Sequence, residues 1–370
     1  MRAGQGTSGS QRAVFAIVGG GFRTRAFLRV TRELPSRFLV CGVVTRSADN
    51  GLSLEQEWGV PTYRTVNELL SKCSPDFVIV SVAPGVAPSV ITEITHHGLP
   101  VLTETPPSLD VEGLLSLDKL VRSGARIQVA EQYHLEPLLR SQISIARSGR
   151  IGNVSEASVS VCHDYHGVSL IRRFLGIGFE DATITGHEFL TSVKAGPDRA
   201  GDPREDRMID EVHTTARLDF GDSIGTYDFS TDQYRSWIRS HHVLVRGDLG
   251  ELRDDELRYL QDFRTPIRLP ISRVNTGGPG NHEGFYLRGL TLGDAWVYVN
   301  EFSPARLADD ELSIATLLTK MVDYVHGGPE VYSLADASQD QYLQLVVRRA
   351  VQSGESIRTQ PQPWARSIDR

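Results

Sequence analysis

The stretch Ala16-Ile17-Val18-Gly19-Gly20-Gly21-Phe22-Arg23 decides the fold of this chain. It joins an apolar run, Ala13–Val18, which has the composition of a buried strand, to Phe22–Thr31, which has the pattern of a helix. Glycines at such a junction let the backbone approach a pyrophosphate closely, while the free N–H groups of the helix attract its negative charge. The pattern predicts a dinucleotide-binding turn. Because Thr24 stands where G-x-G-x-x-G requires its third glycine, a simple tight turn is the alternative.

The first third of the chain alternates short apolar runs with helical stretches, as parallel strands joined by crossover helices do. Further strands are predicted at Leu39–Val44, Asp76–Val82, Val101–Thr103 and Ile127–Ala130. The helices between them are predicted at Leu52–Trp58, Thr65–Ser71, Ala87–His97 and Asp110–Ser123. We expect a doubly wound parallel sheet, covered on both faces, with its ligand crevice at the carboxyl ends of the strands.

After about residue 150 the chain changes to strands in which polar and apolar residues alternate, a pattern typical of half-exposed, mainly antiparallel sheets. These strands are predicted at Val154–Val161, Ala182–Phe189, Glu211–Phe220, Ser223–Phe229, His242–Arg246, Gly284–Leu292 and Ala295–Val299. Two terminal helices are predicted near Leu307–His326 and Leu334–Gln352, and two mobile loops at Lys194–Arg207 and Ser272–Glu283. The division expected is a flexible leader (1–12), a dinucleotide-binding domain (13–132) and a substrate and oligomerisation α/β domain (133–370).

Composition narrows the function classes. The 370 residues are 40% hydrophobic and 23% charged, with a net charge of −7 and no basic run, which argues against nucleic acid or an anionic membrane as partner. No window approaches about eighteen consecutive apolar residues, so no membrane span is predicted. The three cysteines, Cys41, Cys73 and Cys162, lie far apart without paired spacing, which favours a reducing, cytoplasmic setting.

The end of the second predicted strand bears on the choice of cofactor. An acidic residue at this place binds the ribose hydroxyls of NAD, whereas arginine or hydroxyl side chains accommodate the extra phosphate of NADP. The chain has Thr45, Arg46 and Ser47 there, and its first carboxylate is Asp49. NAD or NADP is therefore expected, with NADP favoured.

Several motifs appear in a fixed order along the chain: Gly19–Arg23, the strand ending before Ala83-Pro84, Leu102–Pro107, Gln132–Pro137, and His163–Gly167 leading to Gly176. In this order the chain resembles the Gfo/Idh/MocA oxidoreductases over nearly its whole length. The resemblance implies a Rossmann domain followed by an α/β domain with an open sheet, which often forms a homodimer or homotetramer. It also implies hydride transfer between a nicotinamide and a secondary hydroxyl of a small carbohydrate or sugar derivative.

The resemblance implies catalytic residues, but two of the usual ones are replaced. The family's Glu-Lys-Pro is here Glu104-Thr105-Pro106, so Thr105 stands where the lysine contacts nicotinamide and substrate. Counting back ten residues from Gly176 places the family's catalytic histidine at His166. The aspartate four residues before it falls on Cys162, and Asp164 is its nearest substitute. We expect His166 to act as acid/base, with Thr105 and Asp164 beside it.

The remaining site residues follow from the same resemblance. The dinucleotide is expected to contact Gly19, Gly21, Phe22, Arg23, Thr45, Arg46, Ala83, Pro84, Glu104, Thr105 and Gln132. The substrate is expected to contact His134, Tyr165 and Arg172.

Three other functions are compatible with the sequence. Cys162, Asp164 and His166 share one face if their segment is an extended strand, but a fourth metal ligand is not evident, so no metal is predicted. Loss of the lysine and the aspartate together is compatible with a non-catalytic dinucleotide-binding sensor. Transient oxidation of a sugar during glycosidic cleavage or epimerisation is the third alternative.

Overall fold

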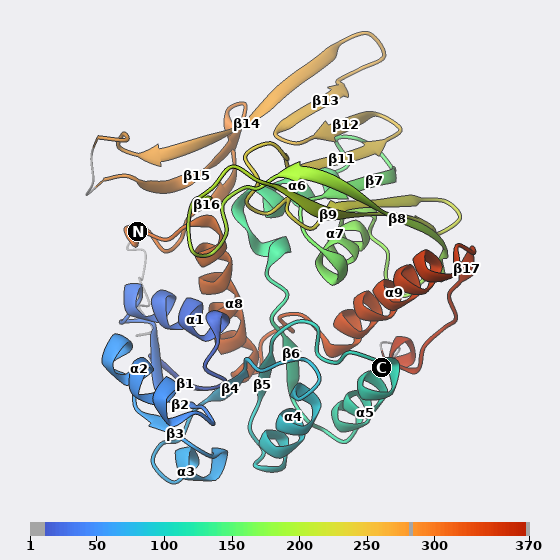
Figure 1. Ribbon diagram of the computed structural model, residues 1–370. Helices are drawn as coiled ribbons and strands as arrows, with labels where there is room; N and C mark the ends of the chain where they lie inside the picture. The colour runs from blue at the N-terminus through green and yellow to red at the C-terminus, as the bar shows by residue number, and fades with distance from the viewer. Residues whose placement is uncertain (1–11, 281–283, 368–370) are drawn as a thin grey trace, which may run out of the picture.

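The computed structural model describes residues 12–280 and 284–367, so the predicted leader lies outside the described residues apart from Arg12. Two sheets dominate the molecule (Figure 1). A parallel sheet built from the N-terminal part of the chain lies at the bottom of this view, and a larger sheet lies at the top. The C-terminal helices α8 and α9 lie between them.

The smaller sheet has six parallel strands in the order β3-β2-β1-β4-β5-β6, which confirms the doubly wound sheet. Its strands are β1 (Ala13–Val18), β2 (Phe38–Val44), β3 (Thr62–Tyr63), β4 (Phe77–Val80), β5 (Val101–Thr103) and β6 (Ile127–Val129). Its helices are α1 (Phe22–Glu33), α2 (Ala48–Trp58), α3 (Val66–Leu70), α4 (Ala87–His96) and α5 (Val111–Arg122). Every residue of β4 is buried, as a strand covered on both faces requires.

The larger sheet has eleven strands in the order β16-β15-β14-β13-β12-β11-β7-β10-β9-β8-β17. They are β7 (Val154–Ser160), β8 (Thr183–Lys194), β9 (Met208–Asp219), β10 (Ile224–Ser230), β11 (His242–Gly247), β12 (Gly250–Arg253), β13 (Glu256–Leu260), β14 (Pro266–Thr276), β15 (Tyr286–Leu292), β16 (Ala295–Val299) and β17 (Ile357–Arg358). Among the described strands of this larger sheet, only β7 and β10 pair in parallel. The mainly antiparallel sheet expected for this half is confirmed.

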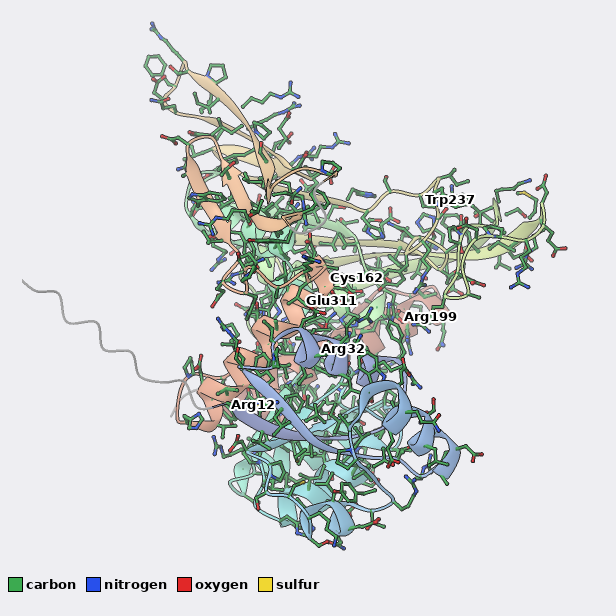
Figure 2. The ribbon with its side chains drawn as sticks, turned by 90° about the vertical axis from the view of Figure 1, so that its left-hand side faces the viewer. Arg12, Arg32, Cys162, Arg199, Trp237 and Glu311 are labelled. Carbon is green, nitrogen blue, oxygen red and sulfur yellow. The ribbon has the colours of Figure 1, made fainter. Side chains whose placement is uncertain are left out.

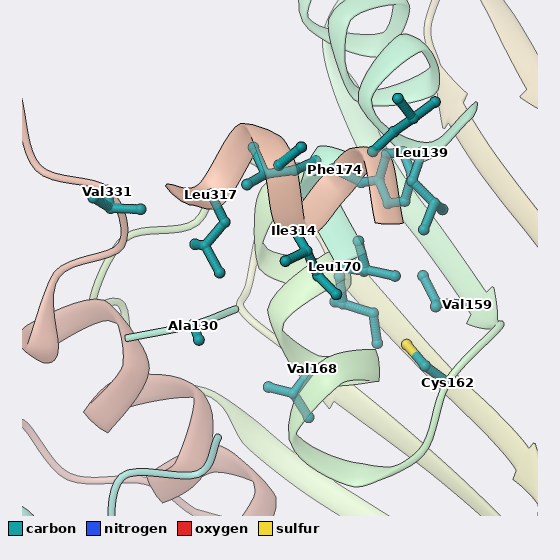
Figure 3. Close-up of a cluster of buried hydrophobic side chains, with 14 of the residues drawn as sticks. Ala130, Leu139, Val159, Cys162, Val168, Leu170, Phe174, Ile314, Leu317 and Val331 are labelled. Carbon is teal, nitrogen blue, oxygen red and sulfur yellow. The ribbon is translucent and has the colours of Figure 1, made fainter. Parts of the chain in front are cut away.

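Helices fill the space between the two sheets. They are α6 (Pro137–Arg147), α7 (Asp164–Leu175), α8 (Asp309–Val325) and α9 (Leu334–Ser353), with short 3-10 turns η1 (Tyr133–Leu135) and η2 (Pro363–Ser367). Figure 3 shows side chains from α6, α7 and α8 meeting in one apolar cluster, among them Leu139, Leu170, Phe174 and Ile314. Because this cluster continues into the parallel sheet, burial of its apolar surface holds the two sheets in one arrangement.

The C-terminal segment also binds directly to the first sheet. The backbone N–H of Val129 in β6 donates to the carbonyl of Tyr332 at 3.0 Å, and α9 packs against α5 and β6. Helix α8 packs against α1, the helix that follows the glycine turn. These contacts fix the relative position of the two sheets, and therefore the width of any cavity between them.

Some sequence predictions are corrected. Strands β12, β13 and β14 and helix α6 were not predicted, and the predicted loop at 272–283 belongs to β14 as far as Thr276. Strands β12 to β14 were not predicted because exposed positions on them carry charged side chains. Glu256 of β13 accepts hydrogen bonds from Arg258 on the same strand and from Arg268 on the neighbouring strand β14. The segment 194–207 joins β8 to β9 mostly without regular structure, as predicted.

Among the described helices none is long and apolar enough to cross a bilayer.

All three cysteines are free thiols, but the fold brings the Sγ atoms of Cys41 and Cys73 to 2.8 Å from one another despite their separation in sequence.

Candidate active site

The glycine turn has the backbone that its sequence predicts. Gly19 has a φ of +128°, and a Cβ at this position would lie 1.9 Å from the carbonyl oxygen of Ser81. Gly21 caps α1, and a Cβ there would meet nothing within 4 Å. The open space beside Gly21, next to the free N–H groups that begin α1, fits the phosphates of a dinucleotide.

Thr24 explains how the turn forms without its third glycine. The side chain is fully buried, and its hydroxyl donates to the carbonyl of Gly19 at 2.9 Å. The hydroxyl therefore stabilises the strained residue of the turn from within the first turn of the helix. The departure from the glycine pattern preserves the geometry of the turn.

A cavity of about 700 Å³ opens beside the end of β2, and we call it the β2 cavity. Gly19, Gly21, Thr45, Arg46 and Ala83, all predicted cofactor contacts, line it. Sequence reasoning missed Asn50 and Arg64. The Asn50 amide donates to the Gly20 carbonyl at 3.1 Å and to the Thr45 hydroxyl at 3.4 Å, and Arg64 donates to the Thr45 carbonyl at 3.1 Å. Neither belongs to a recognisable motif, so only the tertiary structure brings them here.

A second cavity, of about 640 Å³, continues from the glycine turn to the larger sheet, and we call it the His166 cavity. It shares Gly21, Ser81, Val82 and Ala83 with the β2 cavity. Its walls come from both halves of the chain. They include Phe22, Arg23, Glu104, Thr105, Gln132, Tyr133, Glu136, His163, His166, Arg199, Tyr234, Arg235 and Asp310.

His166 lies between two partners in this cavity. Its Nδ1 lies 2.7 Å from Oε2 of Glu131, and its Nε2 lies 3.4 Å from the hydroxyl of Thr105. The imidazole side chain is 15% exposed, whereas the Glu131 side chain is completely buried. Sequence reasoning missed Glu131, although it directly precedes the Gln132–Pro137 motif and is the first carboxylate after β6.

A polar cluster closes the cavity on the side of the first sheet. The Arg23 guanidinium donates to Glu104 at 3.0 Å and to the amide oxygen of Gln132 at 2.6 Å. These three predicted cofactor contacts therefore neutralise and orient one another. They join the glycine turn to the ends of β5 and β6.

Aromatic side chains and a second histidine form the opposite wall. The Tyr234 hydroxyl lies 2.6 Å from Nδ1 of His163 and 3.2 Å from the hydroxyl of Tyr133. Burial and the neighbouring His166 lower the pKa of His163, while burial raises the pKa of both tyrosines. A neutral wall of hydroxyl and ring groups of this kind suits a polar, uncharged ligand such as a sugar.

The segment between β8 and β9 reaches across from the larger sheet. Arg199 places its guanidinium 4.7 Å from the ring centre of Phe22, beside the glycine turn. Both residues line the His166 cavity. A part of the chain predicted only as a loop thus helps to enclose the site.

Asp164 corrects the prediction that it assists His166. Its carboxylate accepts from the Gln344 amide at 2.7 Å and from Arg348 at 2.8 Å, both on α9. The reason is that β7 ends at Ser160 and α7 begins at Asp164, so the segment is not the extended strand on which residues 164 and 166 share a face.

The structure also corrects the predicted substrate contacts. The ring of His134 packs against Tyr332, with 5.3 Å between ring centres, and Tyr165 is buried beneath His166. Arg172 is only 3% exposed and pairs with Asp340 in the core. Pro84 is absent from the described lining of both cavities.

The described residues contain no group of three or more histidine, cysteine or acidic side chains arranged to hold a metal ion. Cys162, which the strand interpretation placed near His166, is fully buried in the apolar cluster of Figure 3.

A glycine turn on a parallel sheet, with an adjoining cavity that contains an imidazole–carboxylate pair, is the arrangement expected of a dinucleotide-binding oxidoreductase. Residues 14–133 match the family model GFO_IDH_MocA, described as an oxidoreductase family with an NAD-binding Rossmann fold. Over these residues the chain is similar to the Gfo/Idh/MocA oxidoreductases. No curated protein has significant sequence similarity to the chain.

Solved structures share the fold over both sheets. An NAD-binding oxidoreductase from Klebsiella pneumoniae matches with a TM-score of 0.69 at 14% identity, covering 95% of this chain and 100% of its own. The WlbA dehydrogenase from Chromobacterium violaceum, in complex with NADH and UDP-GlcNAcA, matches with a TM-score of 0.62 at 12% identity, covering 95% and 96%. A myo-inositol dehydrogenase from Corynebacterium glutamicum matches with a TM-score of 0.63 at 12% identity, covering 95% and 100%.

Proposed function

We propose that this protein transfers a hydride between a nicotinamide cofactor and a secondary hydroxyl or ketone of a sugar or sugar derivative, with His166 as acid/base. The observation that carries the proposal is the position of Nε2 of His166. It faces Thr105 in a cavity that continues into the glycine turn. Two solved structures of similar fold support the substrate class: a dehydrogenase in complex with NADH and UDP-GlcNAcA, and a myo-inositol dehydrogenase.

Different residues of this chain have separate roles in the proposed reaction. The glycine turn and α1 hold the pyrophosphate, and the β2 cavity holds the adenosine. The bound nicotinamide supplies the hydride acceptor or donor. Nε2 of His166 takes the hydroxyl proton as the carbinol is oxidised and returns it in the reverse direction. Thr105 donates a hydrogen bond to the same oxygen without bringing a charge. We propose a matching division of the chain, with 13–132 for the dinucleotide and 133–370 for the substrate.

We further propose NADP as the preferred cofactor. Arg46 and Ser47 line the β2 cavity at the end of β2, where a carboxylate would otherwise bind the ribose. Arginine binds phosphate through charge-assisted hydrogen bonds. Mass spectrometry of cofactor carried through purification, followed by titration with NAD and NADP, tests this choice. Tighter binding of NAD would reject the preference while leaving the oxidoreductase proposal intact.

The central experiment replaces His166. Turnover is measured by nicotinamide absorbance over a panel of sugars, sugar acids, nucleotide sugars and cyclitols, with product analysis for reactions without net redox change. His166→Ala is expected to lower kcat by about 10²- to 10⁴-fold, the usual contribution of a positioned acid/base. Cofactor affinity is expected to remain, since the glycine turn is untouched. His187→Ala is the control, because His187 is an exposed histidine on β8.

The outcomes separate the alternatives. Full turnover in His166→Ala would remove this histidine from the mechanism. Tight cofactor binding without turnover on any substrate would favour a sensor. Rearranged or cleaved sugar without net change in absorbance would favour transient oxidation. The buried carboxylate bound to His166 favours an enzyme, since a sensor has no need for an oriented imidazole.

A further inference from the structure

Glu131 occupies an unusual position for a carboxylate. It lies directly after β6, its side chain is 0% exposed, and both of its oxygens have partners. Oε1 accepts from the backbone N–H of Tyr133 at 3.0 Å, and Oε2 lies 2.7 Å from Nδ1 of His166. Burial of a carboxylate carries a large desolvation cost, so a completely buried one with this geometry calls for a function.

We propose that Glu131 is a positioning residue that holds His166 in the Nδ1–H tautomer, with the lone pair of Nε2 directed into the cavity. A carboxylate accepts hydrogen bonds but does not donate them, so the nitrogen facing Oε2 must carry the proton. Nε2 is then left as the basic nitrogen, and the Thr105 hydroxyl donates to it. The catalytic consequence rests on the proposed function, whereas the tautomer does not.

The groups around the imidazole support this assignment. Tyr133 contacts one side of the ring, with 4.7 Å between ring centres, and Tyr165 meets it edge-on at 5.3 Å. His163 lies edge-on to the His166 ring, with 5.4 Å between ring centres, and its own Nδ1 is hydrogen-bonded with the hydroxyl of Tyr234. Of the described neighbours, only Glu131 forms a hydrogen bond with Nδ1 of His166. The ring is therefore packed on its faces and oriented by one carboxylate.

Glu131 takes the place of the aspartate that is missing at position 162. Position 162, where an aspartate was expected, carries a thiol that lies in the apolar cluster. The alternative carboxylate, Asp164, binds α9. Glu131 instead reaches His166 from the other sheet, thirty-five residues earlier in the chain. The pair thus forms only when the two halves of the molecule are docked.

Glu131→Gln gives a sharp test because of the second hydrogen bond. The Tyr133 N–H requires an acceptor, so the amide oxygen of the introduced glutamine is expected to face Tyr133 and its NH₂ group to face His166. An NH₂ donor at that place requires an unprotonated Nδ1, and the proton moves to Nε2. The substitution keeps the size of the side chain and inverts the tautomer.

The measurement is the ¹⁵N spectrum of histidine-labelled protein at about pH 8.5, where a histidine of ordinary pKa is neutral. Two-bond correlations identify which ring nitrogen carries the proton, and the His166 signals are assigned by their loss in His166→Asn. We expect Nδ1–H in the unmodified protein and Nε2–H in Glu131→Gln. The exposed His187 should be unaffected. Glu355→Gln, at an exposed glutamate, is the matched control.

Kinetics provide the second readout. Glu131→Gln is expected to lower kcat by about 10²- to 10⁴-fold with little change in KM, because the base is lost while the cavity persists. An Nε2–H or doubly protonated His166 in the unmodified protein, or an unchanged tautomer in folded Glu131→Gln, would overturn the proposal. The spectrum of the unmodified protein decides the question even if the variant does not fold. If no substrate is turned over, the proposed function fails while the tautomer is still tested.

Discussion

At the scale of single residues, the site depends on a few positions whose chemistry cannot be exchanged. His166 and Glu131 form the hydrogen-bonded pair described above, and the Thr24 hydroxyl stabilises a turn that lacks its third glycine. Thr105 replaces a lysine with a neutral donor, so stabilisation of a developing alkoxide must depend more on the imidazole. The cavity therefore has the oriented base of an oxidoreductase but fewer positive charges near the reacting oxygen.

Substitutions at the two ends of the glycine turn are expected to affect stability and cofactor binding differently. Gly19→Ala is expected to lower stability by at least about 1–3 kcal/mol and to abolish cofactor binding, because the residue has a φ of +128° and its Cβ meets the Ser81 carbonyl. Gly21→Ala is expected to leave stability unchanged, since its Cβ enters open space, and yet to weaken cofactor binding. Denaturant unfolding and calorimetric titration measure the two effects. Equal stability of both variants would contradict this account.

At the scale of elements, α7 is held to α9 by a buried ion pair. Arg172 contacts Asp340 at 2.5 Å, and Asp340 also accepts from the hydroxyl of Tyr332. Burial raises the pKa of Asp340 to about 6, despite the opposing effect of Arg172. Because α7 carries His166 and α9 packs on the first sheet, this pair connects the imidazole to the docking of the two sheets.

Removal of one partner of this pair should be costly. Arg172→Met is expected to destabilise the protein by about 3–5 kcal/mol, since it leaves Asp340 buried without its counter-ion. The double variant Arg172→Met/Asp340→Asn should recover part of that loss, because the uncompensated charge is gone. Urea unfolding of the two single variants and the double variant measures the coupling. Strictly additive losses would show that the pair does not act as a unit.

Glu136, at the start of α6, is expected to make the stability of the protein depend on pH. Burial, followed by the charges of Asp310, Asp309 and Glu131, raises the pKa of Glu136 from an ordinary 4.5 to about 8. The folded state therefore holds the proton more tightly than the unfolded state does, and this group costs stability as pH rises from about 4.5 to 8. Glu136→Gln should remove that part of the pH dependence. Unfolding free energies across this window measure it, and parallel profiles for variant and parent would disprove the assignment.

At the scale of the whole molecule, the larger sheet leaves apolar side chains uncovered at its β8–β9 end. Leu190 is 72% exposed and Met208 is 59% exposed, and Trp237 is 69% exposed on the neighbouring loop. Figure 2 shows Trp237 standing out from the body of the protein at this end. Apolar side chains gathered in this way mark an association surface. We therefore expect a homodimer or homotetramer through this sheet.

Sedimentation velocity tests this expectation. Leu190→Asp is expected to shift the protein towards monomer, because a carboxylate at the contact would be buried without a partner. Leu260→Asp is the control, since Leu260 is an exposed leucine on β13, away from the β8–β9 end. A monomeric parent protein, or an unchanged oligomer in Leu190→Asp, would refute the role of this end of the sheet.

The fold class follows from the sequence because its signals are local. Uninterrupted apolar strands such as Phe77–Val80 predict a covered parallel sheet, and alternation along residues 154–161 predicts a half-exposed one. The glycine turn is a local signal of the same kind, whereas His166 was identified through the resemblance of its segment to the family pattern. Strands β12 to β14 were not predicted because charged pairs, within β13 and between β13 and β14, replace apolar alternation there.

By itself, the sequence determined two sheets, a dinucleotide turn at Gly19–Phe22 and the histidine at 166 as the candidate base. Only the tertiary structure decided which carboxylate faces that histidine: Glu131 binds His166, whereas Asp164 binds Gln344 of α9. In the structure His134, Tyr165 and Arg172 do not line either cavity. Asn50 and Arg64 line the β2 cavity, and Arg199 lines the His166 cavity. The physical reason is that periodicity assigns a side chain to a face of its own element. What that face meets depends on how α7, α8 and α9 dock the two sheets together.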